Sequence, residues 1–443
     1  MQSLPYDNGI QWCPFIPSLI GGKMNLLVVG GGGREHAVIR KLKENKNITK
    51  IYCAPGNGGI AADAECVAIK ATDVEAMVSF AKENAIDFCV VTPDDPLALG
   101  MVDAMEEQGI PCFGPTANAA IIEASKAFSK DLMRKYNIPT AKYEIFTDSN
   151  EVMEYIHKEN QYPVVIKADG LALGKGVLIA KDEAEADAAV KELMVDQVFG
   201  KSGSKVVVEE FMTGPEVSVL AFTDGNVIRP MISSMDHKRA NDNDEGLNTG
   251  GMGTIAPSPY YTKEIAETCM NTIFLPTVQA MKAEGRTFKG CLYFGLMLTP
   301  NGPKVVEYNC RFGDPETQVV LPLLKSDLFT IMKACHDGNL VDVDVEWSDE
   351  ACACVVEASG GYPESYEKGK EIHGLDANGQ HEGVIVYHAG TKLEEGKFYT
   401  NGGRVLGITA KGKDLAEALE HAYKGVSEIT FDKMHYRTDI GRK

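Results

Sequence analysis

From Met24 onward, short apolar segments alternate with segments of helical periodicity, and this alternation restricts the fold more than any other feature of the chain. The apolar runs cover 24–30, 49–53, 87–92 and 110–113, and the helical patterns between them cover 34–45, 73–84 and 97–108. Strands that alternate with helices form a parallel sheet with helices on both faces. The sequence therefore predicts an α/β domain over residues 24–124.

The pattern changes after a helical segment at 125–137, which ends ahead of Pro139. Extended runs joined by Gly- and Asp-containing turns continue to about residue 345, and they predict an α+β domain rich in antiparallel strands. A further unit, 346–443, opens with WSDEACACVVEASGGYP. It contains strand patterns near 352–358, 384–388 and 404–409 and a helical pattern at 414–428. We expect a small α+β C-terminal domain, with domain boundaries that are only approximate.

Residues 1–23 differ from the rest of the chain. They contain three prolines, no basic start and only a short apolar stretch, which does not fit a secretory signal. Met24 opens a clean strand pattern, so we expect it to be the natural start and the preceding residues to derive from cloning or from upstream reading. A natural, poorly ordered extension is the alternative.

Charge and cysteine content exclude several classes of protein. The formal net charge is −19 and the longest local basic run is 237–239, which disfavours binding to nucleic acid or to anionic membranes. The 11 cysteines form no CxxC pair, so we expect free thiols and a reducing, cytoplasmic location. No apolar run reaches the roughly 18 residues that a membrane span needs. An acidic protein that binds anions must place individual cations at its sites.

The glycine-rich segment GGGGREH, 30–36, lies between the first strand and the first helix. Glycines there let backbone amides approach an anion at the helix N-terminus. The dinucleotide pattern G-x-G-x-x-G does not fit, because its sixth position falls on Glu35 or His36, so a nicotinamide cofactor is disfavoured. We expect a phosphate or ribose-phosphate site with Arg34 as counter-charge; the alternative is a tight structural turn. The loop 54–59 would lie at the same sheet edge.

A second glycine-rich segment, VVIKADGLALGKGV, covers 164–177. A mobile glycine loop can cover phosphates with its N–H groups while Lys167 neutralises charge from the strand below. The pattern G-x-x-x-x-G-K-[ST] of P-loops is absent, and an ordinary hairpin is the alternative. The acidic segment 206–219 follows, where a strand leads into a short linker that can bind an adenine edge and ribose hydroxyls. A solvated acidic strand end is the alternative for that segment.

Two polar segments follow. In the polar loop 236–253, Asp236 could bind an ammonium group, and the basic residues at 237–239 could bind anions. The alternative is a solvated loop without a ligand. In KVVEYNCRFGDPETQ, 304–318, Glu307 and Asn309 are two residues apart and share one strand face. A carboxylate and an amide oxygen are suitable ligands for Mg²⁺ that bridges phosphates. Arg311 continues the same face, and its planar fork suits a carboxylate or an acyl phosphate. The alternative is a salt-bridged strand end.

These segments occur in the order found in the ATP-grasp superfamily of carboxylate–amine ligases. More narrowly, the chain from Met24 almost to Lys443 resembles the phosphoribosylamine–glycine ligase family. The resemblance is carried by VVGGGGREHA, APGNGG, KADGLALGKGV, VVEEFM, NTGGMG, RFGDPETQ and ASGGYP. It implies a parallel-sheet pre-ATP-grasp domain over 24–124, an ATP-grasp domain over 125–345 with a mobile lid at about 140–214, and a C-terminal domain over 346–443.

The resemblance also implies a reaction. ATP, glycine and 5-phosphoribosylamine would give glycinamide ribonucleotide, ADP and phosphate in purine synthesis, through a glycyl phosphate intermediate. Phosphoryl transfer depends on charge neutralisation and alignment more than on a nucleophilic side chain, and the sequence offers no Ser–His–Asp or Cys–His arrangement. We expect ATP as co-substrate, Mg²⁺ or Mn²⁺ as cofactor, only small-molecule substrates as partners, and a monomer or weak homodimer.

Site residues follow from the matching motif positions. The ATP contacts implied are Lys126, Lys167, Gly170, Gly174, Lys175, Gly176, Glu209, Glu210, Phe211 and Glu216. The contacts implied for glycine and phosphoribosylamine are Gly31, Gly32, Gly33, Arg34, Asn57, Asp94, Asp236 and Arg311. Glu307 and Asn309 would hold the metal, and the catalytic positions would be Arg311, Lys167 and Asp236.

The chain departs from the family pattern at two places, and it differs from many other ATP-grasp enzymes at a third. TPDDPL at 92–97 stands where the family reads GPEAPL, which leaves the ribosylamine contact of Asp94 in doubt. Leu247 replaces a proline ahead of NTGGMG, and the strand LYFGLML carries no second metal-binding acid, as is usual in this family. Two other interpretations stay open: another ATP-grasp ligase, such as a biotin-dependent carboxylase subunit, and a non-catalytic nucleotide-binding protein.

Overall fold

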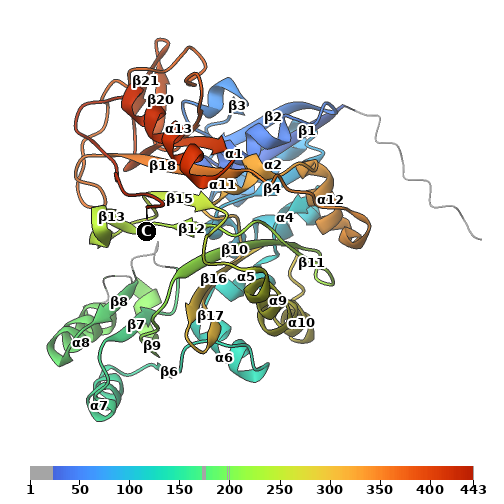
Figure 1. The fold of residues 1–443 in the computed structure, drawn as a ribbon. Coiled ribbons are helices and arrows are strands. Elements are labelled where there is room, and N and C mark those ends of the chain that lie inside the picture. Colours follow the sequence, from blue (N-terminus) through green and yellow to red (C-terminus); the bar gives the residue numbers. More distant parts are fainter. Residues whose placement is uncertain (1–22, 172–175, 197, 199, 443) are drawn as a thin grey trace, which may run out of the picture.

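The computed structural model describes residues 23–171, 176–196, 198 and 200–442 (Figure 1). The extension 1–22 and the expected ATP contacts Gly174 and Lys175 lie outside the described residues. Among the described helices, none combines the length and hydropathy that crossing a bilayer requires.

The N-terminal unit is the expected parallel sheet, with strand order β3-β2-β1-β4-β5. Its strands are β1 (Met24–Gly30), β2 (Ile48–Pro55), β3 (Glu65–Cys66), β4 (Phe88–Val91) and β5 (Cys112–Phe113). Its helices are α1 (Gly33–Leu42), α2 (Val74–Glu83), α3 (Asp94–Ala98), α4 (Met101–Glu107) and α5 (Ala117–Ala124). The single helix expected at 97–108 is interrupted at Gly100, whose φ of 82° places it in the left-handed region that favours glycine.

The middle of the chain forms two antiparallel sheets. The lid sheet has the order β6-β9-β7-β8 and consists of β6 (Tyr143–Phe146), β7 (Val164–Ala168), β8 (Val177–Ala180) and β9 (Val206–Glu210), with α7 (Ser149–Glu159) and α8 (Glu183–Val190). The body sheet has the order β11-β10-β16-β17 and consists of β10 (Glu216–Thr223), β11 (Ile228–Pro230), β16 (Gly290–Thr299) and β17 (Gly302–Asn309). Helices α6 (Lys126–Lys135), α9 (Lys263–Cys269) and α10 (Leu275–Ala283) belong to this part of the chain. The lid projects from the rest of the protein (Figure 1) and has a small core of its own.

The C-terminal unit contains a sheet of order β12-β15-β18-β22-β19, with β23 paired to β18. These strands are β12 (Met235–Asp236), β15 (Gly253–Ala256), β18 (Ala351–Ser359), β19 (Ile385–His388), β22 (Arg404–Gly412) and β23 (Met434–His435); α13 (Leu415–Glu428) packs on them. Two of its strands, β12 and β15, come from the segment assigned to the ATP-grasp domain, so the sheet crosses the boundary expected near 345. The domain limits themselves stay a prediction.

The polar segment 236–253 is more ordered than a solvated loop. It forms a hairpin of β13 (Arg239–Asn241) and β14 (Glu245–Asn248) between β12 and β15. The departure at Leu247 lies in this hairpin, where the side chain is 52% exposed. Leucine in place of proline therefore leaves the surrounding core unchanged.

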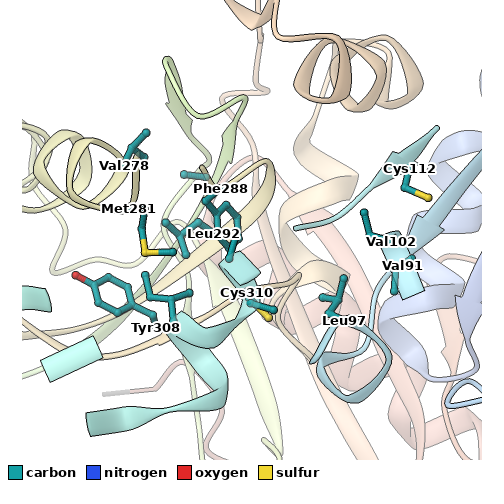
Figure 2. Packing of buried hydrophobic residues seen from close by; sticks show 14 of the residues in the cluster. Val91, Leu97, Val102, Cys112, Val278, Met281, Phe288, Leu292, Tyr308 and Cys310 are labelled. Carbon is teal, nitrogen blue, oxygen red and sulfur yellow. The ribbon is translucent and has the colours of Figure 1, made fainter. Parts of the chain in front are cut away.

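One continuous core connects the N-terminal unit to the body sheet. Figure 2 shows Val91, Leu97 and Val102 of the first unit in the same cluster as Phe288 and Leu292, which lie in and next to β16. Burial of apolar side chains contributes roughly 1.5–3 kcal/mol for each one. The two parts are thus fixed relative to each other, and side chains from both can form a single site.

Candidate active site

A cleft of about 980 Å³ lies between the lid sheet and the body sheet and extends to the N- and C-terminal units. The predicted residues that line it are Arg34, Asp94, Lys126, Lys167, Gly176, Glu209, Glu210, Phe211, Glu216, Asp236, Glu307, Asn309 and Arg311. The other described predictions, which lie outside the lining, are Gly31, Gly32, Gly33, Asn57 and Gly170. Residues separated by more than 270 positions in the chain therefore meet in one cavity.

The expected metal face is formed by the end of β17. Glu307 pairs in register with Gly295 of β16, and a Cβ on Gly295 would lie 3.3 Å from Cγ of Glu307. The absence of a side chain at that position leaves room for the carboxylate. Asn309 Oδ1 accepts a hydrogen bond from Arg311 Nη2 at 3.1 Å. The alternation expected from the sequence thus brings these side chains to one wall of the cleft.

Glu307 lies in a strongly positive environment. Burial would raise the pKa of its carboxyl, but the field of nearby cations lowers it. Those cations are Lys238, Lys167, Lys126 and Arg311. No described residue donates a hydrogen bond to the carboxylate, so its oxygens remain available to a ligand. A carboxylate with spare acceptors among several cations fits a metal that arrives with anionic phosphates.

Arg311 is held by Glu123, which sequence reasoning missed. Glu123 Oε1 lies 3.0 Å from Arg311 Nη2, and Glu123 Oε2 accepts a hydrogen bond from the backbone N–H of Cys310 at 2.7 Å. The buried Nε of Arg311 has no hydrogen-bond partner among the described residues. A buried donor without a partner is costly, so this fork is ready for an incoming acceptor such as a carboxylate.

A buried cluster of charges joins the lid to the body. Glu209 on β9 lies 3.0 Å from Lys167 Nζ through Oε1 and 2.8 Å from Lys130 Nζ through Oε2. Lys130 also donates to Thr140 Oγ1 at 2.8 Å. Burial lowers the pKa of Lys130 to about 8, against the opposing effect of Glu209. Lys130 was not predicted, because a lysine within an amphipathic helix gives no sequence signal of a buried ion pair.

Lys126 begins α6 and points to the glycine loop of the lid. Its Nζ donates to the backbone oxygen of Gly170 at 3.1 Å, and burial lowers its pKa. Gly170 itself is close-packed, since a Cβ there would lie 2.3 Å from Ser202 Oγ. The contact expected between Gly170 and ATP stays a prediction.

The linker between β9 and β10 crosses from the lid sheet to the body sheet. Glu210 Oε1 lies 2.9 Å from Lys304 Nζ and accepts a hydrogen bond from the Lys142 backbone N–H at 3.0 Å. Phe211 is 40% exposed within the cleft lining. At the far end, Glu216 Oε2 lies 3.0 Å from Lys238 Nζ. An exposed aromatic ring and free linker backbone form a surface suited to a planar base.

Asp236 lies at the junction of the body and the C-terminal unit. Its Oδ1 accepts a hydrogen bond from the backbone N–H of His237 at 2.7 Å. Burial, followed by the nearby charge of Glu316, raises the pKa of the Asp236 carboxyl well above its usual value. Glu316 Oε1 accepts a hydrogen bond from the Tyr293 hydroxyl at 3.1 Å. Neighbouring carboxyl groups whose charges repel each other favour a bound cation, which is consistent with an ammonium site.

The glycine loop before α1 is packed more tightly than an open anion site. A Cβ on Gly31 would lie 2.5 Å from the Gly56 backbone oxygen, and one on Gly33 would lie 2.6 Å from Gln318 Nε2. The backbone N–H of Gly32 donates to Glu35 Oε2 at 2.5 Å. Close approach of neighbouring groups therefore accounts for these glycines, and their contact with substrate stays a prediction.

Two further predicted substrate contacts take part in internal bonds. Arg34 donates through Nε to Glu35 Oε1 at 2.6 Å and through Nη1 to the Phe312 backbone oxygen at 3.3 Å. Asn57 Nδ2 donates to backbone oxygens of Gly31, His388 and Ala389, and its Oδ1 accepts from the N–H groups of Gly59 and Ile60. Asn57 thus holds loops together, and its substrate contact remains untested.

A parallel-sheet domain, a lid sheet over a body sheet, and a cleft with a carboxylate–amide pair among lysines and arginines define a ligase of the ATP-grasp class. Residues 24–123 match the family model for the phosphoribosylglycinamide synthetase N domain. Residues 124–317 match the ATP-grasp (A) domain of that enzyme and residues 352–443 match its C domain. The chain belongs to the phosphoribosylglycinamide synthetase family.

Relatives with known names agree with that membership. The chain is 49% identical over 417 residues to a phosphoribosylamine–glycine ligase of Caldanaerobacter subterraneus subsp. tengcongensis, covering 94% of this chain and 99% of the relative. It is 47% identical to the enzyme of that name from Vibrio vulnificus (strain CMCP6), covering 94% of this chain and 98% of the relative.

Solved structures of ATP-grasp enzymes have the same fold as this chain. The crystal structure of phosphoribosylamine–glycine ligase from Thermotoga maritima superposes with a TM-score of 0.82 at 32% identity, over 94% of this chain and all of that one (100%). A biotin carboxylase domain from Hydrogenobacter thermophilus, solved with MgADP, gives a TM-score of 0.72 at 17% identity, over 93% of this chain and 91% of that one. The second likeness concerns the fold alone.

Proposed function

We propose that the cleft joins glycine to 5-phosphoribosylamine using ATP, and that it releases glycinamide ribonucleotide, ADP and phosphate. This is the reaction of the family, so the chain is an ATP-dependent carbon–nitrogen ligase of purine biosynthesis, as the sequence predicts. The observation that carries the finer assignment concerns Arg311, which lines the cleft with Glu307 and Asn309. Its buried Nε has no hydrogen-bond partner among the residues that the structure describes. A carboxylate bound there would lie beside the groups suited to a metal and phosphates.

ATP is assigned to the space between lid and body. The adenine would lie against the linker at Phe211, and Glu216 would accept the ribose hydroxyls. The triphosphate would extend toward Lys126 and Lys167, which line the cleft and whose charges act on the Glu307 carboxyl. Glycine's carboxylate would bind Arg311, and its ammonium group would bind Asp236. These positions use the charges that line each part of the cavity.

The residues present fit a divalent metal. Glu307 offers a carboxylate without a hydrogen-bond donor among the described residues, and Asn309 offers an amide oxygen; both are oxygen ligands of the kind that Mg²⁺ and Mn²⁺ accept. When bound, the metal would neutralise phosphate charge during transfer. The family uses ATP with a divalent metal, and we propose Mg²⁺ or Mn²⁺ as the ion.

The chemistry proceeds in two displacements. A carboxylate oxygen of glycine attacks the γ-phosphorus of ATP, the bond from γ-phosphorus to the bridging oxygen breaks, and ADP leaves. The amine of phosphoribosylamine then attacks the carbonyl carbon of glycyl phosphate, phosphate leaves, and the nitrogen loses a proton. Arg311 and Lys167 stabilise the charge that builds up on the transferred group. Holding both reactants together contributes roughly 7–11 kcal/mol through effective molarity.

One assay tests the overall reaction. The purified chain is mixed with ATP, Mg²⁺ and glycine, and phosphoribosylamine is generated in place from ribose 5-phosphate and ammonia. ADP release that requires both glycine and ribose 5-phosphate is expected. ADP release that ignores either substrate would contradict the assignment and would favour another ATP-grasp ligase, and no release would favour a non-catalytic protein.

An isotope experiment tests the intermediate. Glycine labelled with ¹⁸O in its carboxylate should transfer one ¹⁸O atom to the phosphate product, because that oxygen bridges carbon and phosphorus in glycyl phosphate. Phosphate without label would exclude an acyl phosphate route while leaving the ligase activity in place.

We also propose a reducing, cytoplasmic location and a monomer or weak homodimer. Ten cysteines among the described residues are free thiols, nine of them buried. Size-exclusion chromatography with light scattering, at several protein concentrations, checks the assembly state.

A further inference from the structure

The 5′-phosphate of phosphoribosylamine requires a cation that the assignments above leave free, and this inference rests on the proposed function. The N-terminus of α1 was the expected place, yet the protein already supplies anions there. Gly32 N–H donates to Glu35, and a Cβ on Gly32 would lie 3.4 Å from Asp314 Oδ2. A second anion at that helix end would meet two carboxylates.

The other cations that line the cleft, apart from Arg239, are held by carboxylates or are assigned above to ATP and glycine. Arg34 is bound by Glu35 and by the Phe312 backbone oxygen. Lys238 forms an ion pair with Glu216, and Arg239 Nη1 donates to the Gly246 backbone oxygen. Lys130 is 2% exposed and ion-paired with Glu209. The lysines facing Glu307 are assigned to ATP.

Arg404, at the start of β22, enters this cleft from the C-terminal unit. Only its Nη1 is engaged by backbone, donating to the oxygens of Gly250 at 2.6 Å, Gly251 at 3.5 Å and Asp314 at 2.9 Å. No described residue accepts a hydrogen bond from its Nε or Nη2. The side chain is 21% exposed and lines the cavity.

The NTGGMG turn makes room for this arginine. A Cβ on Gly250 would lie 2.9 Å from Cζ of Arg404, and one on Gly251 would lie 2.6 Å from Asp236 Oδ1. Side chains at either position would push the guanidinium or the Asp236 carboxylate away. The turn therefore holds Arg404 through Nη1. Nε and Nη2 have no hydrogen-bond acceptor among the described residues, although Asp314 Oδ2 lies 3.5 Å from Nη2, and two neighbouring N–H groups of this kind suit bidentate phosphate binding.

A carboxylate lies beside the Nε–Nη2 edge of Arg404. Asp314 Oδ2 lies 3.5 Å from Arg404 Nη2, and Asp314 Oδ1 accepts a hydrogen bond from Gln318 Nε2 at 2.7 Å. This carboxylate would repel a phosphate group placed next to it. It is, however, a hydrogen-bond acceptor when ionised, and it therefore suits the hydroxyl groups of a sugar. The Arg404 cation would therefore suit the phosphate group of a ribose 5-phosphate, and the Asp314 acceptor would suit its ribose hydroxyls.

We propose that Arg404 binds the 5′-phosphate of phosphoribosylamine through Nε and Nη2, and that Asp314 accepts a hydrogen bond from a ribose hydroxyl. Both groups belong to the binding of the amine substrate, since neither is placed near the ATP linker or the Arg311 fork in the assignments above. The C-terminal unit thus has a direct part in substrate selection.

The test compares amines with and without the phosphate. Ribose 5-phosphate with ammonia supplies the phosphorylated amine, and ribose with ammonia supplies its unphosphorylated counterpart. In Arg404→Met, kcat/KM for the phosphorylated amine should fall roughly 100-fold, as expected for loss of charged hydrogen bonds. The value for the unphosphorylated amine and the KM values for ATP and glycine should change less than about 3-fold. Arg404→Lys should recover part of the loss.

Binding of ribose 5-phosphate, measured by calorimetry, gives a second readout that needs no turnover. The wild type should bind it, and Arg404→Met should lose that binding while its circular dichroism spectrum stays unchanged. Asp314→Asn should weaken the binding of both amines to the same extent, because both amines carry the ribose hydroxyls. Lys411→Met on the same strand, whose partner Glu350 lies outside the cleft lining, should match the wild type.

Two outcomes would overturn the inference. Equal losses for both amines in Arg404→Met would show that Arg404 only holds the turn, and unchanged phosphate selectivity and ribose 5-phosphate binding would show that another group binds the phosphate. A wild-type protein that never uses phosphoribosylamine would contradict the proposed function instead. The two failures are therefore distinguishable.

Discussion

Lys167 on lid strand β7 donates a hydrogen bond to the backbone oxygen of Val306 on body strand β17, at 3.3 Å. The same ammonium group lies 3.0 Å from Glu209 Oε1. One lysine thus connects the lid to the opposite wall of the cleft. Phosphates that enter the cleft would compete with these two acceptors, so nucleotide binding and the lid's attachment to the body depend on the same side chain.

Replacement of Glu307 by glutamine should lower kcat by roughly 10²–10³-fold, because it removes the only carboxylate that β17 contributes to the cleft lining among the described residues. The neutral amide keeps the shape of the side chain, so the thermal unfolding midpoint should stay close to that of the wild type. ADP release and circular dichroism measure both effects. Glu245→Gln, in the exposed β14 strand, is the matched control, and full activity in Glu307→Gln would remove the metal role.

Metal binding should depend on the nucleotide. The field of cations that lowers the pKa of Glu307 also repels a bare divalent ion, whereas phosphates would compensate that field. In calorimetric titrations, Mn²⁺ should bind weakly to the protein alone and much more tightly when ADP is present. Equal affinity in both titrations would place the metal site elsewhere.

Lys130→Met should destabilise the protein by about 3 kcal/mol, because it leaves one oxygen of the buried Glu209 carboxylate without its cation. Lys135→Met, on the same helix, removes an ion pair with Glu284 in which the lysine is 63% exposed, and it should leave the urea midpoint close to that of the wild type. Urea unfolding followed by circular dichroism compares the two. Equal losses of stability in the two variants would mean that the ion pair of Lys130 contributes no more than an ion pair at the surface.

Stability should decrease as the pH falls below about 6.5, partly through His388. Burial lowers the pKa of its imidazole to about 3 in the folded state, whereas the unfolded value is 6.5. Between these values the unfolded chain binds a proton that the folded chain does not, so stability falls with pH by up to about 1.4 kcal/mol per unit. His388→Gln should flatten this dependence in urea titrations at successive pH values. The exposed His421→Gln variant should leave it unchanged.

Local patterns predicted the parts of the fold that depend on neighbouring residues. The strand–glycine–helix order at 24–42 and the positions of Glu307 and Asn309 on strand β17 are confirmed as local structure, since period and turn chemistry determine them. Arg311 also lines the cleft, but it lies beyond β17, which ends at Asn309. The single helix predicted at 97–108 was wrong, because the chain forms two helices there, α3 and α4, separated by Leu99 and Gly100. The glycine loop's close packing could not be predicted, because it depends on Gly56 and Gln318 from distant segments.

The missed site residues share one property. Glu123, Lys130 and Arg404 act through partners far away in the chain: Arg404 reaches Gly250 across 154 positions and Asp314 across 90. A single charged residue in a helix or at a strand end is not part of a sequence pattern that would predict such a distant partner. The Gly-Gly-Arg sequence at 402–404 was the available signal, since paired glycines beside a lone arginine allow close approach of backbone.

The pairing of β15 with β18 means that the protein cannot be divided where its sequence character changes. A chain cut at residue 345 would expose the edge of β15, where residues 253–256 now pair with 352–355. Such a fragment should aggregate, and adding the separate segment 346–443 should restore solubility. Chimaeras between relatives would then need to exchange residues 235–256 together with the C-terminal segment, so the unit of recombination is a discontinuous stretch of the gene.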